Sequence, residues 1–159
     1  MTFRIGIGYD SHPFVEGRPL VLAGQHIPYA RGLKGYSDAD AVAHALTDAL
    51  LGAAGAGDIG KLFPPGEPRW KDADSLYLLH VAVEHLRERG WAPAQADLTV
   101  IAEEPRIGPY TEAMRTALAR VLEVDPSQVS VKAKGNEGMG FIGRGEGIAV
   151  IAIAAVEAR

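Results

Sequence analysis

The chain has 159 residues, of which 47% are hydrophobic and 23% charged, and its formal charge is −4. This balance fits one globular domain spanning residues 1–159 and excludes a disordered chain, while the small negative charge offers no broad basic face for nucleic acid. Because the chain contains no cysteine, disulfides and thiolate metal sites are excluded, and any metal must be held by His, Asp or Glu.

The N-terminus MTFRIGIGYD has too short an apolar run to be a signal peptide. The most apolar stretch, residues 148–156, is far shorter than the roughly 20 residues that span a bilayer. We therefore expect a soluble, cytoplasmic protein without a membrane or nucleic-acid partner.

The first half of the chain predicts short strands followed by a helix. Residues 4–9 form the first strand, and residues 20–23 and 27–29 form a hairpin around Gly24. The glycine-containing connection RGLKGYSDAD follows and is expected to be mobile. Ser37 and Asp40 have the spacing of a capping box, which predicts a helix over about residues 38–54. Its core face consists of Val42, Ala45, Leu46, Ala49, Leu50 and Ala53.

The second half alternates helices and strands. A loop rich in glycine and proline, GAAGAGDIGKLFPPGEP, precedes a helix over residues 75–89 that ends at Gly90. A strand over 98–102 is followed by a helix that starts near Pro109 and ends at Asp125. Strands over 129–133 and 147–156 complete the pattern, the former with Val129, Val131 and Ala133 on its buried face. The order predicts an α+β fold with a mixed four-stranded sheet, helices on one face and a small hairpin.

The last predicted strand is apolar on both faces. Ile148 and Val150 point one way, and Ile151 and Ile153 point the other, so both faces need cover. Helices cover one face. The other is covered either by a sheet from another subunit or by a second layer of the same domain, and the pattern favours neither.

Asp10, His12 and His44 are the candidate metal ligands. Asp10 and His12 are two residues apart on a strand, so their side chains leave on the same face. His44 lies one helical turn from both Asp40 and Asp48, in a stripe that lacks the Lys, Glu or Arg of a solvated face. Three such ligands suit a catalytic zinc site with an open fourth position. Structural roles for these residues are an equally good reading of the pattern.

The segment KAKGNEGMGFIGRGEG, residues 132–147, could bind phosphate. Its glycines let the backbone approach phosphate oxygens, Lys132, Lys134 and Arg144 supply positive charge, and Glu137 could hold Mg²⁺. The alternative is a bulged hairpin without a ligand. Gly6-Ile7-Gly8 does not continue as a dinucleotide-binding motif, since Ser11 stands at the third glycine position and no helix follows.

The segments YDSHPF, YSDADAVAHALTDALLGAAGAGDIGKLFPP, KDADS and NEGMGFIGRGEGIA resemble the 2-C-methyl-D-erythritol 2,4-cyclodiphosphate synthase family, in unbroken order along the chain. The resemblance implies a homotrimer with active sites between subunits. It implies zinc or another divalent transition metal at Asp10, His12 and His44, and magnesium or manganese at Glu137. The implied reaction converts 4-diphosphocytidyl-2-C-methyl-D-erythritol 2-phosphate into the 2,4-cyclodiphosphate and CMP, as a phosphorus–oxygen lyase of the non-mevalonate isoprenoid pathway.

The same resemblance implies the residues that contact this cytidine diphosphate substrate. They are Asp10, His12, Tyr36, Ser37, Asp58, Ile59, Gly60, Phe63, Ala102, Pro105, Arg106, Ile107, Ala133, Lys134, Gly135, Asn136, Glu137, Phe141 and Arg144. Arg144 and Glu146 are further expected on the trimer axis, where an isoprenoid diphosphate could bind.

Two residues depart from the family pattern. Tyr36 stands where His is common, and Gly135 where Thr is common, at positions that the resemblance makes catalytic. Tyr36 can donate a hydrogen bond but is no acid near neutral pH, and Gly135 offers only its N–H.

The implied phosphoryl transfer needs no protein nucleophile, because a phosphate monoester with a second pKa near about 6 is mostly dianionic at neutral pH. One rival is a zinc-dependent hydrolase acting on a nucleotide diphosphate, with Asp40 or Asp48 as the general base. A second rival is a non-catalytic trimeric module that binds nucleotides or isoprenoid diphosphates.

Overall fold

The computed structural model describes residues 2–159. In this range five strands form one sheet in the order β4-β1-β7-β5-β6, from Arg31–Leu33, Phe3–Glu16, Gly147–Ala158, Trp91–Ile101 and Val129–Lys134 respectively. The β5–β6 pair is parallel and the other pairs are antiparallel. The sheet is therefore mixed, as predicted.

The sheet has five strands instead of four because β1 is longer than the apolar run Arg4–Tyr9 indicates. Its second half pairs with β4, with Phe14 opposite Leu33. The connection expected to be mobile thus contributes an edge strand. The predicted hairpin is present as β2 (Leu20–Leu22) and β3 (Gln25–Ile27), a separate two-stranded sheet.

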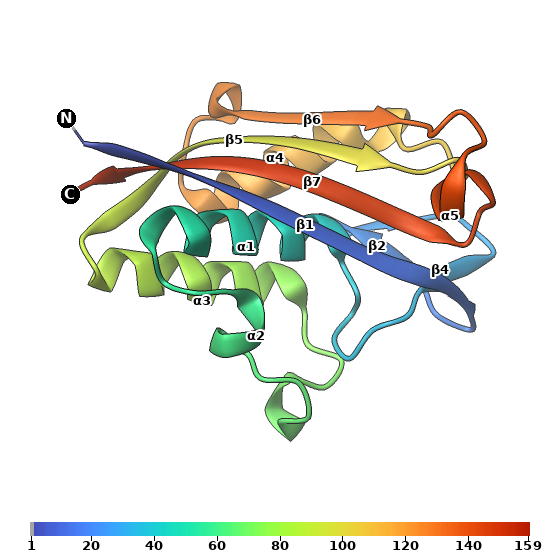
Figure 1. Ribbon diagram of the computed structural model, residues 1–159, viewed down its shortest axis with the longest axis horizontal. Helices are drawn as coiled ribbons and strands as arrows, with labels where there is room; N and C mark the ends of the chain where they lie inside the picture. Colours follow the sequence, from blue (N-terminus) through green and yellow to red (C-terminus); the bar gives the residue numbers. More distant parts are fainter. Residues whose placement is uncertain (1) are drawn as a thin grey trace.

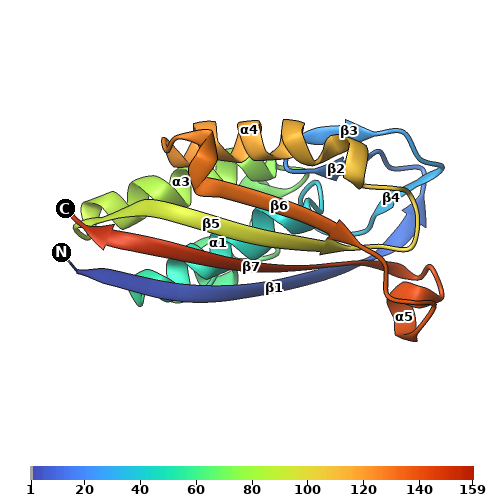
Figure 2. The same cartoon turned by 90° about the horizontal axis from the view of Figure 1, so that it is seen from above.

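Three long helices, α1 (Ala41–Ala54), α3 (Ser75–Glu88) and α4 (Thr111–Leu122), cover one face of the sheet (Figures 1 and 2). The predicted core face of α1 is buried throughout. Helix α1 packs against β7, where every second residue is at most 1% exposed: Ile148, Val150, Ala152, Ala154 and Val156. This interface forms the core.

Helix α1 begins later than predicted, because its N-cap is Asp40 and not Ser37. The Asp40 carboxylate accepts hydrogen bonds from the amide of Ala43 at 3.0 Å and from the amides of Ala23 and Gly24 at 2.8 Å. One buried side chain therefore caps the helix and fixes the turn of the β2–β3 hairpin.

The face of the sheet away from the helices is not covered within residues 2–159. Phe3, Ile5, Ile7 and Tyr9 of β1 are 52–74% exposed, and they are joined on β7 by Ile151 and Ile153. The reading in which β7 is sandwiched within one domain is therefore wrong. Ala133 is exposed as well, against the prediction of a buried position near the end of β6.

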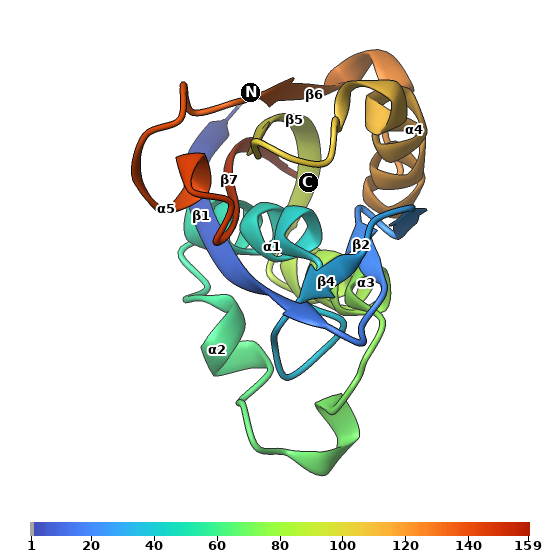
Figure 3. The same ribbon diagram turned by 90° about the vertical axis from the view of Figure 1, so that its right-hand side faces the viewer.

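The remaining described elements are short. Helix α2 (Ile59–Leu62) and the 3-10 turn η1 (Pro68–Trp70) lie in the long loop before α3. The turns η2 (Gly108–Tyr110) and η3 (Pro126–Gln128) flank α4, and α5 (Gly140–Gly143) precedes β7 at one end of the sheet (Figure 3). Among residues 2–159, none of the helices has the length and hydropathy to cross a membrane.

Candidate metal centre and adjoining pockets

Asp10, His12 and His44 converge on one point between β1 and α1. Oδ2 of Asp10 lies 2.8 Å from Nε2 of His12 and 3.3 Å from Nδ1 of His44. The two histidine nitrogens are 3.4 Å apart. One ligand atom from each residue thus lies within 4.8 Å of the others, which is close enough to share an ion.

Two glycines bring α1 close enough to β1 for this convergence. Gly6 and Gly8 lie on the same face of β1 as Asp10, because side chains alternate along a strand. A Cβ on Gly8 would overlap the carbonyl oxygen of Ala45, and one on Gly6 would lie 2.5 Å from the amide nitrogen of Ala53. The Gly6-Ile7-Gly8 pattern therefore permits close packing of a helix, and His44 on that helix reaches the strand.

The outer nitrogen of each histidine is engaged by the protein. Nδ1 of His12 lies 2.8 Å from the carbonyl oxygen of Lys34, to which it can only donate. Nε2 of His44 lies 2.8 Å from Oγ of Ser75 and 3.1 Å from Oγ of Ser37. In the neutral form of His12, Nε2 therefore presents a lone pair to the other two ligands.

Asp10 and His12 shift one another's ionisation. Burial alone would raise the pKa of Asp10, but the neighbouring His12 and His44 outweigh it, and the pKa is lowered. Burial alone would lower the pKa of His12, but Asp10 raises it. Oδ2 of Asp10 is buried and, among the described residues, accepts no hydrogen bond of good geometry. Such an arrangement favours a cation between the three groups, and the N, N, O donor set suits a divalent transition metal.

A cavity of about 260 Å³ adjoins these ligands. It brings together six residues predicted for substrate contact: His12, Tyr36, Ser37, Ile59, Gly60 and Phe63. Its wall also includes Trp70, whose ring packs edge-on against Phe63 at 4.9 Å between centroids. The Tyr36 hydroxyl donates to the carbonyl oxygen of Glu67 at 3.1 Å and so holds the loop that carries Trp70.

Asp58, also predicted for substrate contact, caps α2 by accepting from the amide of Lys61 at 2.9 Å. Asp48 accepts from the amide of Ile59 at 2.7 Å. Burial raises the pKa of Asp48, with the neighbouring charges of Asp58 and Asp10 adding to the rise against the opposing amide of Ile59. The residues of this region thus hold the α2 loop beside the ligands.

A second cavity, of about 290 Å³, lies between the loop after β5 and the end of β6. It collects a further six predicted residues: Ala102, Arg106, Ile107, Ala133, Lys134 and Gly135. Glu103 also lines it and was not predicted individually. Its carboxylate accepts from the amides of Asn136 at 2.6 Å and Gly138 at 3.2 Å, which shapes the glycine-rich loop.

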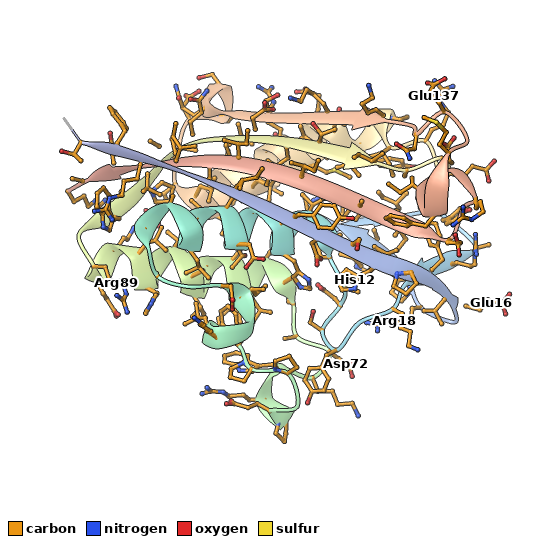
Figure 4. The ribbon with its side chains drawn as sticks, in the orientation of Figure 1. His12, Glu16, Arg18, Asp72, Arg89 and Glu137 are labelled. Atoms are coloured by element: carbon orange, nitrogen blue, oxygen red, sulfur yellow. The ribbon has the colours of Figure 1, made fainter. Side chains whose placement is uncertain are left out.

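The structure does not bring Glu137 to the metal ligands of the same chain, although the end of the glycine-rich segment, Gly147, pairs with Pro13 next to His12. Glu137 follows β6, at one border of the sheet, whereas His12 lies on β1 (Figure 4). Two strands, β7 and β5, lie between β1 and β6. Phe141 is 41% exposed, and Arg144 pairs with Glu146 at 2.8 Å. The bulged-hairpin alternative for this segment is wrong, because β6 and β7 are not paired with each other.

Asp40 does not serve as a base at this centre. It is fully buried and its oxygens accept three backbone amides, so it is structural. The predicted hydrolase therefore lacks Asp40 as a general base. The other candidate base, Asp48, accepts a hydrogen bond from the amide of Ile59.

Ser75 contacts His44, and Asp38 contacts Ser75, but neither was among the predicted site residues. In the sequence KDADS, Asp74 and Ser75 have the pattern of an ordinary helix cap, and Asp74 does accept from the amide of Leu76. Nothing in the sequence alone indicates that Ser75 also contacts His44.

Comparison with known proteins identifies a matching family and close relatives of this chain. The model of the YgbB family matches residues 3–157. A protein of Symbiobacterium thermophilum named 2-C-methyl-D-erythritol 2,4-cyclodiphosphate synthase is 57% identical over 155 residues, which cover 98% of this chain and 99% of that protein. A protein of the same name from Moorella thermoacetica is 57% identical over 150 residues, covering 94% and 92%.

Solved structures agree with these relatives. The bifunctional IspDF from Campylobacter jejuni superposes with a TM-score of 0.95 at 42% identity across 99% of this chain, which spans 43% of that longer chain. A CDP complex of IspF from Plasmodium falciparum superposes with a TM-score of 0.85 at 32% identity, covering 99% of this chain and 97% of that one.

Proposed function

The chain belongs to the YgbB family, and from this premise we propose that residues 1–159 form one 2-C-methyl-D-erythritol 2,4-cyclodiphosphate synthase domain. It converts 4-diphosphocytidyl-2-C-methyl-D-erythritol 2-phosphate into the cyclic diphosphate and CMP, in the non-mevalonate route to isoprenoids. The observation that carries the proposal is the convergence of Asp10, His12 and His44 at the mouth of a pocket. The hydrolase reading has no support among the relatives.

The reaction is an intramolecular phosphoryl transfer. An oxygen of the substrate's 2-phosphate forms a bond to the β-phosphorus, and the bond from that phosphorus to the oxygen of CMP breaks. The attacking phosphate is already mostly dianionic at neutral pH, since its second pKa is near about 6. The protein's task is to fold a flexible, highly charged substrate so that attack is in line, and positioning of this kind is worth on the order of 7–11 kcal/mol.

Asp10, His12 and His44 would hold zinc or another divalent transition metal. When bound, the metal neutralises charge on the phosphates and polarises the phosphorus. The pocket of Tyr36, Ser37, Ile59, Gly60 and Phe63 takes the methylerythritol part of the substrate, with Asp58 beside it. Its mixture of an apolar wall and hydroxyl groups suits a branched polyol.

The second cavity takes the cytidine part, which agrees with the CDP named in a solved relative. Lys134 supplies positive charge and Gly135 offers its backbone N–H to the diphosphate. Asn136, whose amide donates to Glu103, shapes the loop beside them. Glu137 would hold magnesium or manganese, which would neutralise charge on the substrate's diphosphate. Gly135 supports the reacting phosphate through its backbone N–H. Tyr36 can donate its hydroxyl hydrogen to the phosphate only by giving up its hydrogen bond to Glu67, and neither residue transfers a proton.

The metal ligands with the first cavity form one half of the site, and the second cavity with Glu137 forms the other. The two halves can act on one substrate only if they come from different copies of the chain. β1 and β6 are three inter-strand steps of about 4.8 Å apart, or about 14 Å, whereas the metals of two-metal sites lie about 3.5–4 Å apart. Contact between opposite borders of two copies is head-to-tail and gives a closed ring where the rotation between copies permits it, and the family resemblance implies three copies. We therefore assign a homotrimer with three active sites between subunits.

The open face of the sheet fits this assembly. Its exposed side chains on β1 and β7 would be covered in the trimer, and contiguous apolar surface of this kind marks an interface. Arg144 and Glu146 are assigned to the trimer axis, where an isoprenoid diphosphate could bind beside the Arg144 guanidinium. Titration with geranyl diphosphate in which wild type and Arg144→Ala behave alike would remove this assignment.

One assay tests the reaction. The protein is incubated with the diphosphocytidyl substrate and Mg²⁺, and the products are identified by ³¹P NMR. We expect CMP and the cyclic diphosphate in equal amounts. Inorganic phosphate or a linear product would favour a hydrolase, and tight binding without turnover would favour a non-catalytic module.

A further inference from the structure

We infer that Ser75 and Asp38 are positioning residues that act on the metal through His44. They form a hydrogen-bonded relay that fixes the His44 ring in the tautomer with hydrogen on Nε2, so that Nδ1 keeps its lone pair for the cation. The inference rests on the proposed metal site, but it concerns residues outside the ligand set.

The direction of each hydrogen bond follows from what the groups can donate. The Asp38 carboxylate accepts from the amide of Ser75 at 2.9 Å and from the amide of Asp40 at 3.0 Å. The hydroxyl of Ser75 makes a short contact with the same carboxylate and must be the donor, because a carboxylate only accepts. The single hydrogen of that hydroxyl is then used.

Oγ of Ser75 can therefore only accept from the ring nitrogen 2.8 Å away, Nε2 of His44. The closer of the two hydroxyls beside Nε2 can thus only accept, whereas Oγ of Ser37 is farther, at 3.1 Å. This places the hydrogen on Nε2 and leaves Nδ1 bare and directed at Asp10, 3.3 Å away. In metal sites, groups that bind the outer nitrogen of a histidine ligand set its tautomer and increase its basicity. Serine and carboxylate together do this for His44, whereas the carbonyl oxygen of Lys34 does it for His12.

Both members of the relay are held in place by the backbone, with Ser75 buried and Asp38 half-buried. Ser75 is 0% exposed and is the first residue of α3, where its backbone is fixed by the helix. Asp38 is held from both sides, since its own amide donates to the carbonyl oxygen of Ala73 at 3.2 Å. The relay thus ties α1, α3 and the segment before α1 to one ring nitrogen.

The first test is the tautomer itself. Long-range ¹H–¹⁵N spectra of the metal-free wild-type protein, with His44→Ala to assign the signals, should show His44 protonated on Nε2 and His12 on Nδ1. A neutral His44 carrying its hydrogen on Nδ1 would overturn the inference. This measurement needs no variant of the relay and so does not depend on whether such a variant folds.

The second test is zinc affinity, measured by competition with a chromophoric chelator. Ser75→Ala should bind zinc at least about tenfold more weakly, since loss of an outer partner costs 10–100-fold. The matched control is Thr47→Val, because Thr47 is equally buried and its hydroxyl donates to the carbonyl oxygen of Ala43, away from the ring of His44. The control should lose stability but keep wild-type zinc affinity.

Three results would count against the idea, in different ways. Equal zinc affinity in wild type and Ser75→Ala would overturn the relay alone. Equal weakening in Ser75→Ala and Thr47→Val would assign the loss to folding and also overturn it. A wild-type protein that takes up no zinc would overturn the metal site on which the proposed function depends.

Discussion

Gly8 of β1 lies directly against Ala45 of α1, so close that a Cβ on Gly8 would overlap the carbonyl oxygen of Ala45. His44, the neighbour of Ala45, lies within reach of Asp10 because of this contact. The backbone, and not only the ligands, therefore defines the metal centre.

We predict that Gly8→Ala moves α1 away from β1, lowers the free energy of unfolding by about 1–3 kcal/mol and weakens zinc binding. Thermal unfolding and zinc titration measure both effects. The control is Gly52→Ala, on the exposed side of α1, where an added Cβ meets nothing within 4 Å. This change should raise stability by about 0.4–1 kcal/mol. Unaltered zinc affinity in Gly8→Ala would contradict the prediction.

Substitution of one metal-ligating residue should abolish metal binding. His44→Ala and Asp10→Ala are expected to lose both zinc and turnover while remaining trimeric, because two ligands do not hold zinc firmly. Elemental analysis of the purified variants, with light scattering for their mass, provides the measurement. His80→Ala, an exposed change on α3, serves as the control. Full zinc content in either ligand variant would refute the assignment.

Glu137→Gln should separate the two metals. Because Glu137 is not among the zinc ligands, the variant should keep zinc but need much more Mg²⁺ for half-maximal activity. Steady-state rates across a Mg²⁺ series measure this requirement. Glu112→Gln, on the exposed side of α4, provides the comparison. An unchanged Mg²⁺ dependence would remove Glu137 from the site.

A charged side chain introduced on the open face of the sheet should be destabilising only where chains assemble. Ile7 is 71% exposed within one chain, so Ile7→Glu costs little in the isolated fold but places a carboxylate in the proposed interface. We expect smaller particles by light scattering and a loss of activity. Tyr77→Glu is the control, because Tyr77 is 56% exposed on α3. A trimeric, active Ile7→Glu protein would place the interface elsewhere.

Asp40 should make stability depend on pH. Burial raises its pKa from 3.8 to about 6, and the charge of Asp38 adds to the rise, while the amides of Ala43, Gly24 and Ala23 oppose it. Because the pKa of Asp40 is higher in the folded state, its carboxyl contributes stability that is fully present below about pH 3.8. This stability is lost as the pH rises through about 6. Relative to Asp40→Asn, wild type should lose roughly 1 kcal/mol per pH unit in this window.

Urea unfolding at pH 4.5, 5.5 and 6.5 in the presence of a chelator tests this dependence, because bound metal then makes no contribution. Asn remains a good helix cap, so the variant should fold. Parallel pH profiles for the two proteins would show that Asp40 titrates normally.

Local patterns predicted much of this fold. The six core residues predicted from helical spacing in α1 are all buried, but Ala41, Ala43, Thr47 and Leu51 are buried as well and were missed. Asp10, His12 and His44 were identified as candidate ligands from alternation and a polar stripe. These signals depend on residues close together in sequence. The fifth strand was missed because Arg31–Leu33 has no strand pattern of its own and is ordered by pairing with the end of β1.

Other features depend on contacts between distant segments, which periodicity does not reveal. Ser75 has the pattern of a helix cap whether or not it also meets His44. Glu103 has the pattern of a loop residue, and only the approach of residues 136–138 shows what it binds. The separation of Glu137 from the metal ligands likewise follows from strand order, which the sequence does not state.

The alternation of β1 has a consequence for how this protein can change. Even-numbered positions carry Gly6, Gly8, Asp10 and His12 toward the helices, while Ile5, Ile7 and Tyr9 at odd-numbered positions point outward. Inserting or deleting a single residue before Asp10 would exchange the two sets, placing bulky side chains against α1 and ligands on the outer surface. Lineages of this enzyme should therefore accept substitutions in the strand far more readily than any change in its length.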